Sequence, residues 1–536
     1  MGTIRTAGDE GDKRYFMKQF RIVLILLVFL ASALWLWGVN DPYVGIYNAN
    51  NNYLTLAVKN YFRFGFQTLH FLPTYFASNP LPPHVDYYLH HPILFFLIST
   101  IPFKLFGFHN WVVHVAPFIF SIGSLYFIYK IGEKLWGRTV GIWSSVCAML
   151  FPMHSFFWKY IFFEQITLFF NLWILSIFLL YREKQKKLYL ITAALLSFLC
   201  MLSDWYALYL CFIFPLFFFM KRRKETLRFS LMYGASVGIG LLFFLSLIYF
   251  GKGNFQDMVQ AVSVRSFNPE LFSHSYPFLR LLLLSLFRIV LYFTPIALVG
   301  AILCIKEFFQ KKDEQGIFLL GMFIFGLINC IVLPTATWGH SYFLYLFIPF
   351  FAFTEGLFLK KIRHKTVLFY ICLVIIVATS IAVNFAKIQQ VRKQSWKYDV
   401  ARVVSDRLNP FETIGVVNVA GDVFEQYFLH PTITYALPDI QKKIDDPLFP
   451  RFVLIACADV CTEEEEKNIS ALQEQFVTTP YVFQNNTAWL VTKEIRMIPR
   501  IEEQKAEISN PVVEYTVHPI IKWYRRIRDF LGVGQI

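Results

Sequence analysis

The sequence predicts a polytopic α-helical membrane protein with a small α/β domain near its C-terminal end. Hydrophobic residues make up 56% of the 536 residues, aromatic residues 19% and charged residues only 16%. A soluble domain averages about 25% charged residues. Apolar runs recur as far as residue 387 with short basic clusters between them, whereas residues 390–500 have an ordinary globular composition.

The basic excess of the chain indicates a membrane protein and not a nucleic-acid-binding protein. The formal net charge is +14, but the Lys and Arg residues lie in the clusters between apolar runs, which is the bias that orients membrane proteins. We therefore expect membrane lipids, and no nucleic acid, as partners. The first apolar run, residues 22–39, is long enough to span a bilayer and lacks a small-residue cleavage site, so it is typical of an anchor.

The basic clusters also predict the orientation. With residues 1–21 as a cytoplasmic N-terminus, the transmembrane domain at 22–387 forms about eleven spans, and every strong basic cluster lies on one side. A first outer loop at 40–110 is expected to hold a helix at 52–64. A second helix, at 93–106, is too short for an upright span and is expected at the interface. Later spans are expected at about 111–131, 140–157, 188–202, 206–220 and 277–306. Between them, one span leads from Glu164 to the basic cluster at Arg182 and another ends near Phe250. A pair that turns at 338–340 and a last span that ends near 387 complete the set.

The C-terminal part is predicted to lie outside the membrane as an extracytoplasmic α/β domain at 390–500, with the whole chain in the plasma (cell) membrane. Short β-rich runs alternate there with polar segments. They lie at 414–419, 433–435, 452–455 and 488–491. In the tail, 501–536, residues 518–531 have an apolar and a basic helical face, which favours an interfacial helix on anionic lipid; a helix packed on its own domain is an equally open interpretation.

Under this topology, most unusual polar residues gather near the outer ends of the spans. The segment Asp86-Tyr87-Tyr88-Leu89-His90-His91-Pro92 lies just before the expected interfacial helix. Ionisable groups close to lipid need partners or a wet cavity, so this segment indicates a site. The other members of the set are Asp41, Asn48, Asn50, Lys159, Glu164, Asp204, Trp205, Arg265, Arg280 and His340.

Several of these residues also have a purely structural interpretation. Asp41 and Asp204 are suited to turns, and Glu164 at the start of an apolar helix would interact with the helix dipole. Lys159 and Arg280 could contact lipid headgroups. The functional interpretation is transfer from a lipid-linked sugar: one carboxylate takes a proton from the acceptor, while Lys, Arg or a divalent metal neutralises the departing phosphate.

The order of the motifs resembles that of a known family. The motifs are Tyr53 to Gly65, Tyr87-Tyr88-Leu89-His90-His91-Pro92, Leu105-Phe106-Gly107, Lys134-Leu135-Trp136-Gly137, Phe163-Glu164 and Ser203-Asp204-Trp205. Over about residues 20–360 the chain resembles the dolichyl-phosphate-mannose protein mannosyltransferase-like family, within the C-type (GT-C) superfold of membrane glycosyltransferases. That family also includes the bacterial aminoarabinose transferases and is related to the catalytic subunits of oligosaccharyltransferases.

The resemblance implies an inverting transfer of a monosaccharide, a hexose or a pentose, from a polyprenyl-phosphate donor to a lipid, glycan or protein acceptor at the outer face. It further implies an acidic base in the first outer loop and a second acidic residue after the third span. Glu164 occupies the second position. The first falls on Asn48 to Asn50, and Asn cannot take a proton at neutral pH. We expect Asp41 to replace it, with Asp86 as an alternative and loss of activity as a third possibility.

The predicted catalytic residues are therefore Asp41 and Glu164. Any divalent metal, Mg or Mn, would be held by Asp41, Glu164 and His91. The predicted substrate-binding residues are Asn48, Asn50, Asp86, His90, His91, Lys159, Asp204, Trp205, Arg265, Arg280 and His340. Two other functions stay open: a flippase or transporter of a lipid-linked glycan, which should carry charges deep within its spans, and an inactive relative that binds lipid-linked sugar.

Overall fold

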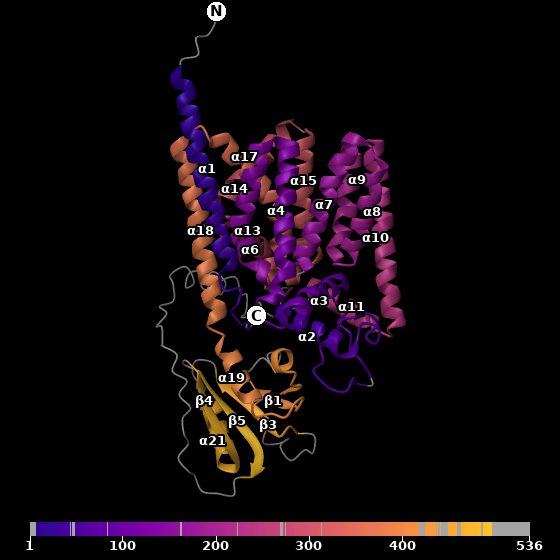
Figure 1. The fold of residues 1–536 in the computed structure, drawn as a ribbon, viewed down its shortest axis with the longest axis vertical. Helices are drawn as coiled ribbons and strands as arrows, with labels where there is room; N and C mark the ends of the chain where they lie inside the picture. The colour runs from indigo at the N-terminus through magenta and orange to yellow at the C-terminus, as the bar shows by residue number, and fades with distance from the viewer. Residues whose placement is uncertain are drawn as a thin grey trace, which may run out of the picture.

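The computed structural model describes residues 7–42, 44, 49–82, 84–160, 163–221, 223–267, 272–273, 275–311, 313–417, 424–435, 437, 440, 449–457, 463–483 and 486–495. Most of these residues form a bundle of roughly parallel helices, and a smaller domain lies at one end of the bundle (Figure 1). The helices that run along the bundle are α1 (Ala7–Leu36), α4 (Val115–Trp136), α5 (Arg138–Leu150), α7 (Phe163–Lys184), α8 (Lys187–Met201), α9 (Leu210–Lys221), α10 (Lys224–Phe250), α14 (Pro295–Lys311), α15 (Glu314–Val332), α17 (Ile348–Ile362) and α18 (Thr366–Arg392).

The helices are apolar enough for a multi-pass membrane protein, but the predicted count of eleven spans is not confirmed. Within the described residues, six helices are long and apolar enough to cross a membrane, or up to eight if each of two bent pairs is one span. Four shorter apolar helices accompany them, at Ile22–Leu36, Leu94–Phe106, Lys187–Met201 and Trp205–Phe219. The prediction of a polytopic α-helical membrane fold is therefore confirmed, and the exact number of crossings stays a prediction.

The predicted span at 277–306 is not a single helix. α13 (Pro277–Phe293) ends at Phe293, and Pro295 begins α14 at an angle of 113° to it. Between them Thr294 has a backbone φ of +75°, a left-handed conformation that interrupts a helix. Pro295 adds to the break because proline disfavours the helical conformation of the residue before it. Hydropathy alone could not predict this bend, because both halves are equally apolar.

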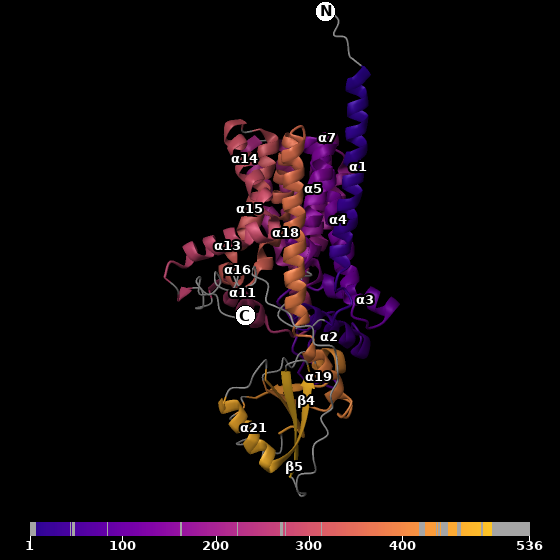
Figure 2. The same ribbon diagram turned by 90° about the vertical axis from the view of Figure 1, so that its left-hand side faces the viewer.

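One end of the bundle carries short helices from two loops. α2 (Ala49–Phe64) and α3 (Leu94–Phe106) of the first outer loop, and the later helix α11 (Phe255–Phe267), lie at this end in both ribbon views (Figures 1 and 2). The predicted helix at 52–64 is thus present as α2. The apolar segment predicted at the interface is α3, and it lies beside α2 rather than along the bundle axis.

The opposite end of the bundle carries the basic clusters. Lys134 at the end of α4 pairs with Glu183 at the end of α7, and Arg182 of α7 pairs with Glu314 at the start of α15. These ion pairs tie together helix ends that the sequence places in separate basic clusters. These ion pairs and the outer-loop helices thus lie at opposite ends of the bundle, and the direction in which the bundle crosses the membrane stays a prediction.

The small domain is a mixed sheet with helices beside it. Its strand order is β2-β1-β3-β5-β4, in which β1 is parallel to β2 and β3, and β5 is antiparallel to β3 and β4. The elements are α19 (Trp396–Ser405), β1 (Ile414–Val417), β2 (Thr432–Thr434), β3 (Phe452–Cys457), α21 (Glu463–Gln475), β4 (Phe476–Phe483) and β5 (Asn486–Ile495). The sequence predicted the other four strands but missed β4, an edge strand that contains Pro480. The predicted tail helix at 518–531 lies outside the described residues.

The domain is held against the first outer loop by polar contacts. The ammonium of Lys59 on α2 donates to the backbone oxygen of Tyr427, at 3.1 Å. The Tyr427 hydroxyl lies 3.2 Å from the amide oxygen of Asn110. The guanidinium of Arg63 lies 4.9 Å from the ring centre of Phe411. These contacts place the domain at the same end of the bundle as the polar residues of the outer loop.

Candidate active site

Four elements bring polar side chains together at this end of the bundle. His91 lies just before α3, Glu164 is in the first turn of α7, and Arg265 is in the last turn of α11. Asp204 precedes the short helix η3 (Trp205–Tyr209) and caps it, because its Oδ1 accepts a hydrogen bond of 2.8 Å from the backbone N–H of Trp205. The sequence motif Ser203-Asp204-Trp205 is therefore a helix start that also fixes a carboxylate.

The imidazole of His91 joins Asp204 to Arg265. Its Nδ1 lies 2.9 Å from Oδ1 of Asp204, and its Nε2 lies 3.4 Å from Nη2 of Arg265. Because a guanidinium can only donate, Nε2 is the acceptor and the ring proton is on Nδ1, where it is donated to Asp204. The ring also stacks on Phe163, with centres 3.9 Å apart and planes within 3°. Burial and the charge of Arg265 hold the pKa of His91 well below its usual range, so the ring is neutral.

The site contains two buried carboxylates, those of Glu164 and Asp204. Glu164 is 3% exposed and Asp204 is 1% exposed. Oε1 of Glu164 accepts from the hydroxyl of Tyr206 at 3.3 Å. Within the described residues, Oε2 of Glu164 and Oδ2 of Asp204 have no hydrogen-bond partner. A buried polar atom without a partner costs about 1–3 kcal/mol, so these two oxygens are suited to receive hydrogen bonds, or a proton, from a substrate.

The electrostatics of the two carboxylates are set by burial and by Arg265. Arg265 interacts favourably with both, while the carboxylates repel each other. Burial raises the pKa of Asp204 to about 7, although the Trp205 N–H and Arg265 partly oppose this rise. The charge of Asp204 therefore changes close to neutral pH.

Neutral polar groups also lie near Arg265. Its guanidinium donates a hydrogen bond to the hydroxyl oxygen of Tyr88. Burial and Arg265 lower the pKa of His90 to about 4, and burial, Arg288 and Arg265 lower the pKa of His340 to about 4. At neutral pH both imidazoles are therefore uncharged, and the guanidinium is the permanent positive charge of the site.

A groove leads from the first outer loop to Arg265. One cavity of about 500 Å³ is lined by Asp86, Tyr88, His90 and Asp257 among others. A second cavity of about 330 Å³ shares His90 and Asp257 with the first and is also lined by Arg265. The predicted residues Asp86, His90 and Arg265 thus line one continuous path. Trp205 supports it, because its indole N–H donates to the backbone oxygen of His90 at 2.8 Å.

Asp41 lies in a second polar cluster. Its carboxylate accepts two hydrogen bonds from Arg392 of α18, at 2.6 and 3.2 Å. Lys159 is fully buried, donates to the backbone oxygen of Trp37 at 2.6 Å and interacts electrostatically with Asp41. In the described part of the chain, the electrostatic partners of Glu164 are Asp204 and Arg265, and not Asp41. The expectation that Asp41 and Lys159 act beside Glu164 is therefore not met by their contacts.

The predicted metal-ligand set is not assembled either. Among the described residues, no three His, Cys, Asp or Glu side chains are placed to hold a metal ion. Both oxygens of Asp41 are engaged by Arg392, and both ring nitrogens of His91 by Asp204 and Arg265. The set Asp41, Glu164 and His91 does not fit a metal centre, and we derive no step through a metal.

Asn50 and Arg280 are two further predicted residues in the described part of the chain. The side chain of Asn50 on α2 donates to the backbone oxygen of Tyr160, at 3.3 Å. Arg280 is half-buried near the start of α13. Asn48 lies outside the described residues.

Four polar residues in or near the two polar clusters were not predicted as site residues: Tyr88, Tyr206, Arg288 and Arg392. Tyr206 and Tyr88 stand within or beside the quoted motifs, so proximity to Asp204 and His90 was an available signal. Arg288 lies within the apolar run of α13 and donates to the backbone oxygens of Thr337 and Trp338. A charged residue inside such a run is itself a signal of a polar cavity. The sequence gave no indication of a role for Arg392, because its partner Asp41 lies far away in the sequence.

The sequence matches a family model over the segment that carries most of the site. Residues 90–250 match the model described as dolichyl-phosphate-mannose-protein mannosyltransferase. This segment includes His91, Glu164 and Asp204, while Arg265 and His340 lie beyond it. No curated protein sequence matches the chain significantly.

The fold is similar to those of solved membrane glycosyltransferases. ArnT from Cupriavidus metallidurans in the apo state has a TM-score of 0.60 and 11% identity, and the match covers 88% of this chain and 98% of ArnT. ArnT bound to undecaprenyl phosphate gives 0.59 and 10%, over 87% and 97%. The oligosaccharyltransferase AglB from Archaeoglobus fulgidus, in complex with an inhibitory peptide and a dolichol-phosphate, gives 0.53 and 13%, over 91% and 75%.

These findings confirm the resemblance predicted from the motif order. At such low identities the solved structures establish the fold alone, and the family model matches the part of the chain that holds His91, Glu164 and Asp204. The chain is a multi-pass membrane protein with the fold of these GT-C glycosyltransferases, and its residues 90–250 are similar in sequence to the dolichyl-phosphate-mannose-protein mannosyltransferases.

Proposed function

We propose that the protein is a membrane glycosyltransferase that moves a monosaccharide from a polyprenyl-phosphate donor to an acceptor, with inversion at the sugar. The observation that carries the proposal is the pair of buried carboxylates, Glu164 and Asp204, each with one unpartnered oxygen, beside the buried guanidinium of Arg265. The match of residues 90–250 to the mannosyltransferase model supports the same reaction class. The polyprenyl phosphates bound to ArnT and AglB support the donor class.

The proposed reaction is a single displacement. The acceptor oxygen attacks C1 of the sugar on the face opposite the phosphate, and the C1–O bond to the phosphate breaks. Its electron pair leaves with the polyprenyl phosphate, whose new charge is stabilised by Arg265. The proton of the acceptor passes to Oε2 of Glu164, the unpartnered oxygen. General-base assistance of this kind is worth roughly 10²–10⁴-fold in rate.

Arg265 is assigned the phosphate because it is a permanent charge with a planar donor set. Guanidinium matches phosphate oxygens with two parallel hydrogen bonds. Asp204 and His91 are positioning residues in this scheme: they hold the guanidinium through the imidazole. His90 and His340 are neutral side chains near the same guanidinium.

The orientation follows from the same proposal. The N-terminus is assigned to the cytoplasm and the site to the extracytoplasmic face of the plasma membrane, because the basic clusters and the candidate active site lie at opposite ends of the bundle. This orientation is tested by the variants Lys134→Cys and Asn254→Cys, whose cysteines lie at opposite ends of the bundle. Each is treated with a membrane-impermeant thiol reagent in intact cells. Labelling is expected at position 254 only.

The activity is tested with purified full-length protein and a panel of polyprenyl-phosphate sugars, by release of the polyprenyl phosphate. Time-dependent release with at least one donor is expected, and it should be lost in Glu164→Gln. No release with any donor, together with transbilayer movement of the donor in vesicles, would support the flippase. Binding of donor without release, with release gained in Asn50→Asp, would support an inactive relative.

A further inference from the structure

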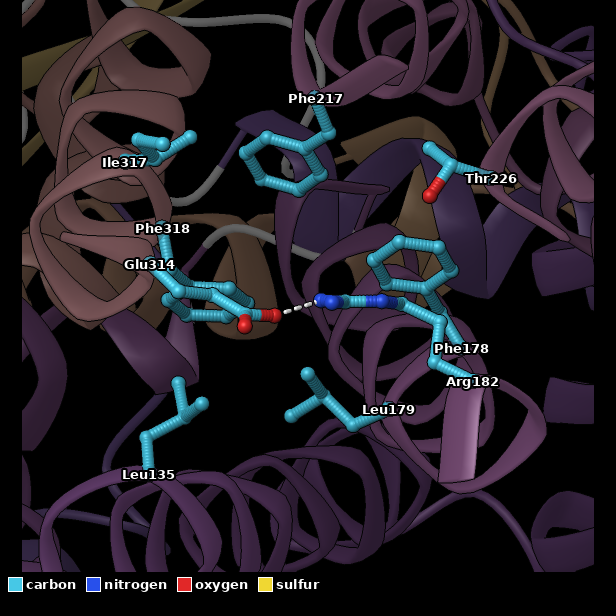
Figure 3. Close-up of a pocket in the computed structure, with 9 residues that line it drawn as sticks. All are labelled: Leu135, Phe178, Leu179, Arg182, Phe217, Thr226, Glu314, Ile317 and Phe318. Atoms are coloured by element: carbon cyan, nitrogen blue, oxygen red, sulfur yellow. Dashed lines mark ion pairs between the residues drawn. The ribbon is translucent and has the colours of Figure 1, made fainter. Parts of the chain in front are cut away.

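Three cavities meet around Leu179, at the end of the bundle that carries the basic clusters. A groove of about 520 Å³ lies between α4 and α7 and is lined by Phe127, Lys134, Trp173 and Ser176 among others. A polar cavity of about 330 Å³ shares Lys134 and Leu179 with it. A slot of only about 20 Å³ adjoins the polar cavity. Figure 3 shows aromatic rings around the ion pair of Arg182 and Glu314 in this slot.

The groove runs along the seam between α4 and α7. At Gly123 the ring of Phe169 packs directly against the backbone of α4, since a Cβ added there would lie 2.4 Å from that ring. About one turn further along, Phe127 and Trp173 stack in parallel, with centres 5.4 Å apart, and line the groove. Tyr126, beside them, is 54% exposed. Tyr126 lines the groove and both helices are candidate membrane spans, so we place the groove on the lipid-facing surface of the bundle.

The charges around the groove and the polar cavity leave one positive charge in excess. Four cationic and three anionic side chains line them: Lys130, Lys134, Arg182, Arg223, Glu133, Glu183 and Glu314. Nε of the Arg182 guanidinium is buried and has no hydrogen-bond partner within the described residues. An excess of one positive charge, with a buried donor to satisfy, complements the single negative charge of a phosphodiester.

We propose that this groove binds an anionic phospholipid, with its phosphate at Lys134 and Arg182 and an acyl chain along Phe127 and Trp173. The volume of the groove lies within the range of about 300–1,000 Å³ typical of ligand sites, whereas the slot has room for no more than about one water molecule. The acyl chain of the lipid therefore lies in the groove between α4 and α7 and not in the slot. Anionic lipids are drawn to basic clusters at a membrane surface, which favours this occupant over a zwitterionic lipid.

The test is lipid retention by the full-length protein in native mass spectrometry, with phosphatidylglycerol and phosphatidylcholine of identical acyl chains. The wild type is expected to retain phosphatidylglycerol preferentially. Lys134→Gln removes one cation and should lower that retention by about fivefold, the effect of one basic residue at a membrane surface. Ser176→Trp fills the groove without changing its charge and should give a similar loss. Lys361→Gln is the matched control, because it removes a cation paired with Glu307 at the same end but outside the groove.

Equal retention of the two lipids by the wild type would overturn the proposal, as would an equal loss in Lys361→Gln. Displacement of the lipid by free glycerol phosphate would assign the site to a soluble phosphate instead. Size-exclusion profiles and thermal unfolding confirm that each variant is folded, and Ser176→Leu replaces Ser176→Trp if the larger residue prevents folding. Because the readout is bound lipid, the result does not depend on glycosyl transfer.

Discussion

Arg265 on α11 and Asp204 at the start of η3 are joined through one imidazole ring, that of His91. The ring donates from Nδ1 to Asp204 at 2.9 Å and accepts at Nε2 from Arg265 at 3.4 Å. The three residues come from segments more than 50 residues apart in the chain. These two contacts fix the orientation of the Arg265 guanidinium beside the carboxylates of Asp204 and Glu164. The proposed chemistry depends on that orientation.

Removal of the guanidinium should abolish stabilisation of the leaving phosphate. Arg265→Gln is expected to lower kcat for sugar transfer by about 10²–10³-fold, the loss typical of one electrostatic donor in a transition state. Arg265→Lys should recover part of this loss, since it keeps the charge but not the paired donors. Steady-state assays of polyprenyl-phosphate release measure both. Equal activity of Arg265→Gln and the wild type would remove Arg265 from the site.

Disruption of the link through His91 should weaken catalysis without removing any charge. His91→Phe keeps an aromatic ring that can stack on Phe163 but cannot hydrogen-bond Asp204 or Arg265. A fall in kcat of about tenfold is expected, from the loss of roughly one well-placed hydrogen bond. A merely structural role would instead appear as lower thermal stability with unchanged kcat in the folded fraction.

The rate should depend on pH through Asp204. The pKa of Asp204 is raised to about 7, so its carboxylate is ionised above pH 7 and protonated below it. The ionised form holds His91 and balances Arg265, and transfer is therefore expected to increase as the pH rises through about 7. His90 and His340, whose pKa values are lowered to about 4, do not titrate in this range. In Asp204→Asn the rate should be low and the inflection near pH 7 should be lost. An unchanged inflection near pH 7 in that variant would contradict the assignment.

Asp41 should affect stability and not chemistry. Its ion pair with Arg392 is partly exposed, with 31% of the Asp41 side chain and 40% of the Arg392 side chain accessible. Partly exposed pairs contribute about 0–1 kcal/mol. Asp41→Asn is therefore expected to lower the melting temperature slightly while kcat stays within about twofold of the wild type. Arg392→Gln serves as the matched variant, and a large loss of kcat in either one would restore Asp41 to the site.

The sequence predicted the fold class because the fold is encoded in local patterns. Apolar length, basic clusters and β-rich runs each depend on neighbouring residues, and they led to the helical bundle, the short helix α3 and four of the five strands. The bend at Thr294 and the edge strand β4 were missed because hydropathy does not report a single backbone angle or a strand that contains proline.

The site was predicted in part. Glu164, Asp204, His91 and Arg265 were all selected from the sequence, because ionisable groups stand out in an apolar chain. Their mutual contacts were not, since proximity between α7, η3 and α11 is a property of the packed bundle. The choice of Asp41 rested on its position near the Asn48 to Asn50 stretch, and its pairing with Arg392 of α18 could not be inferred from local sequence.

The central claim is that the reaction takes place at Glu164 and not at Asp41. The most direct test compares polyprenyl-phosphate release by Glu164→Gln and Asp41→Asn, purified and assayed side by side with the same donor. A loss of about 10²-fold or more in Glu164→Gln, with near wild-type release in Asp41→Asn, is the predicted result. The reverse pattern, with release abolished in Asp41→Asn and preserved in Glu164→Gln, would contradict it.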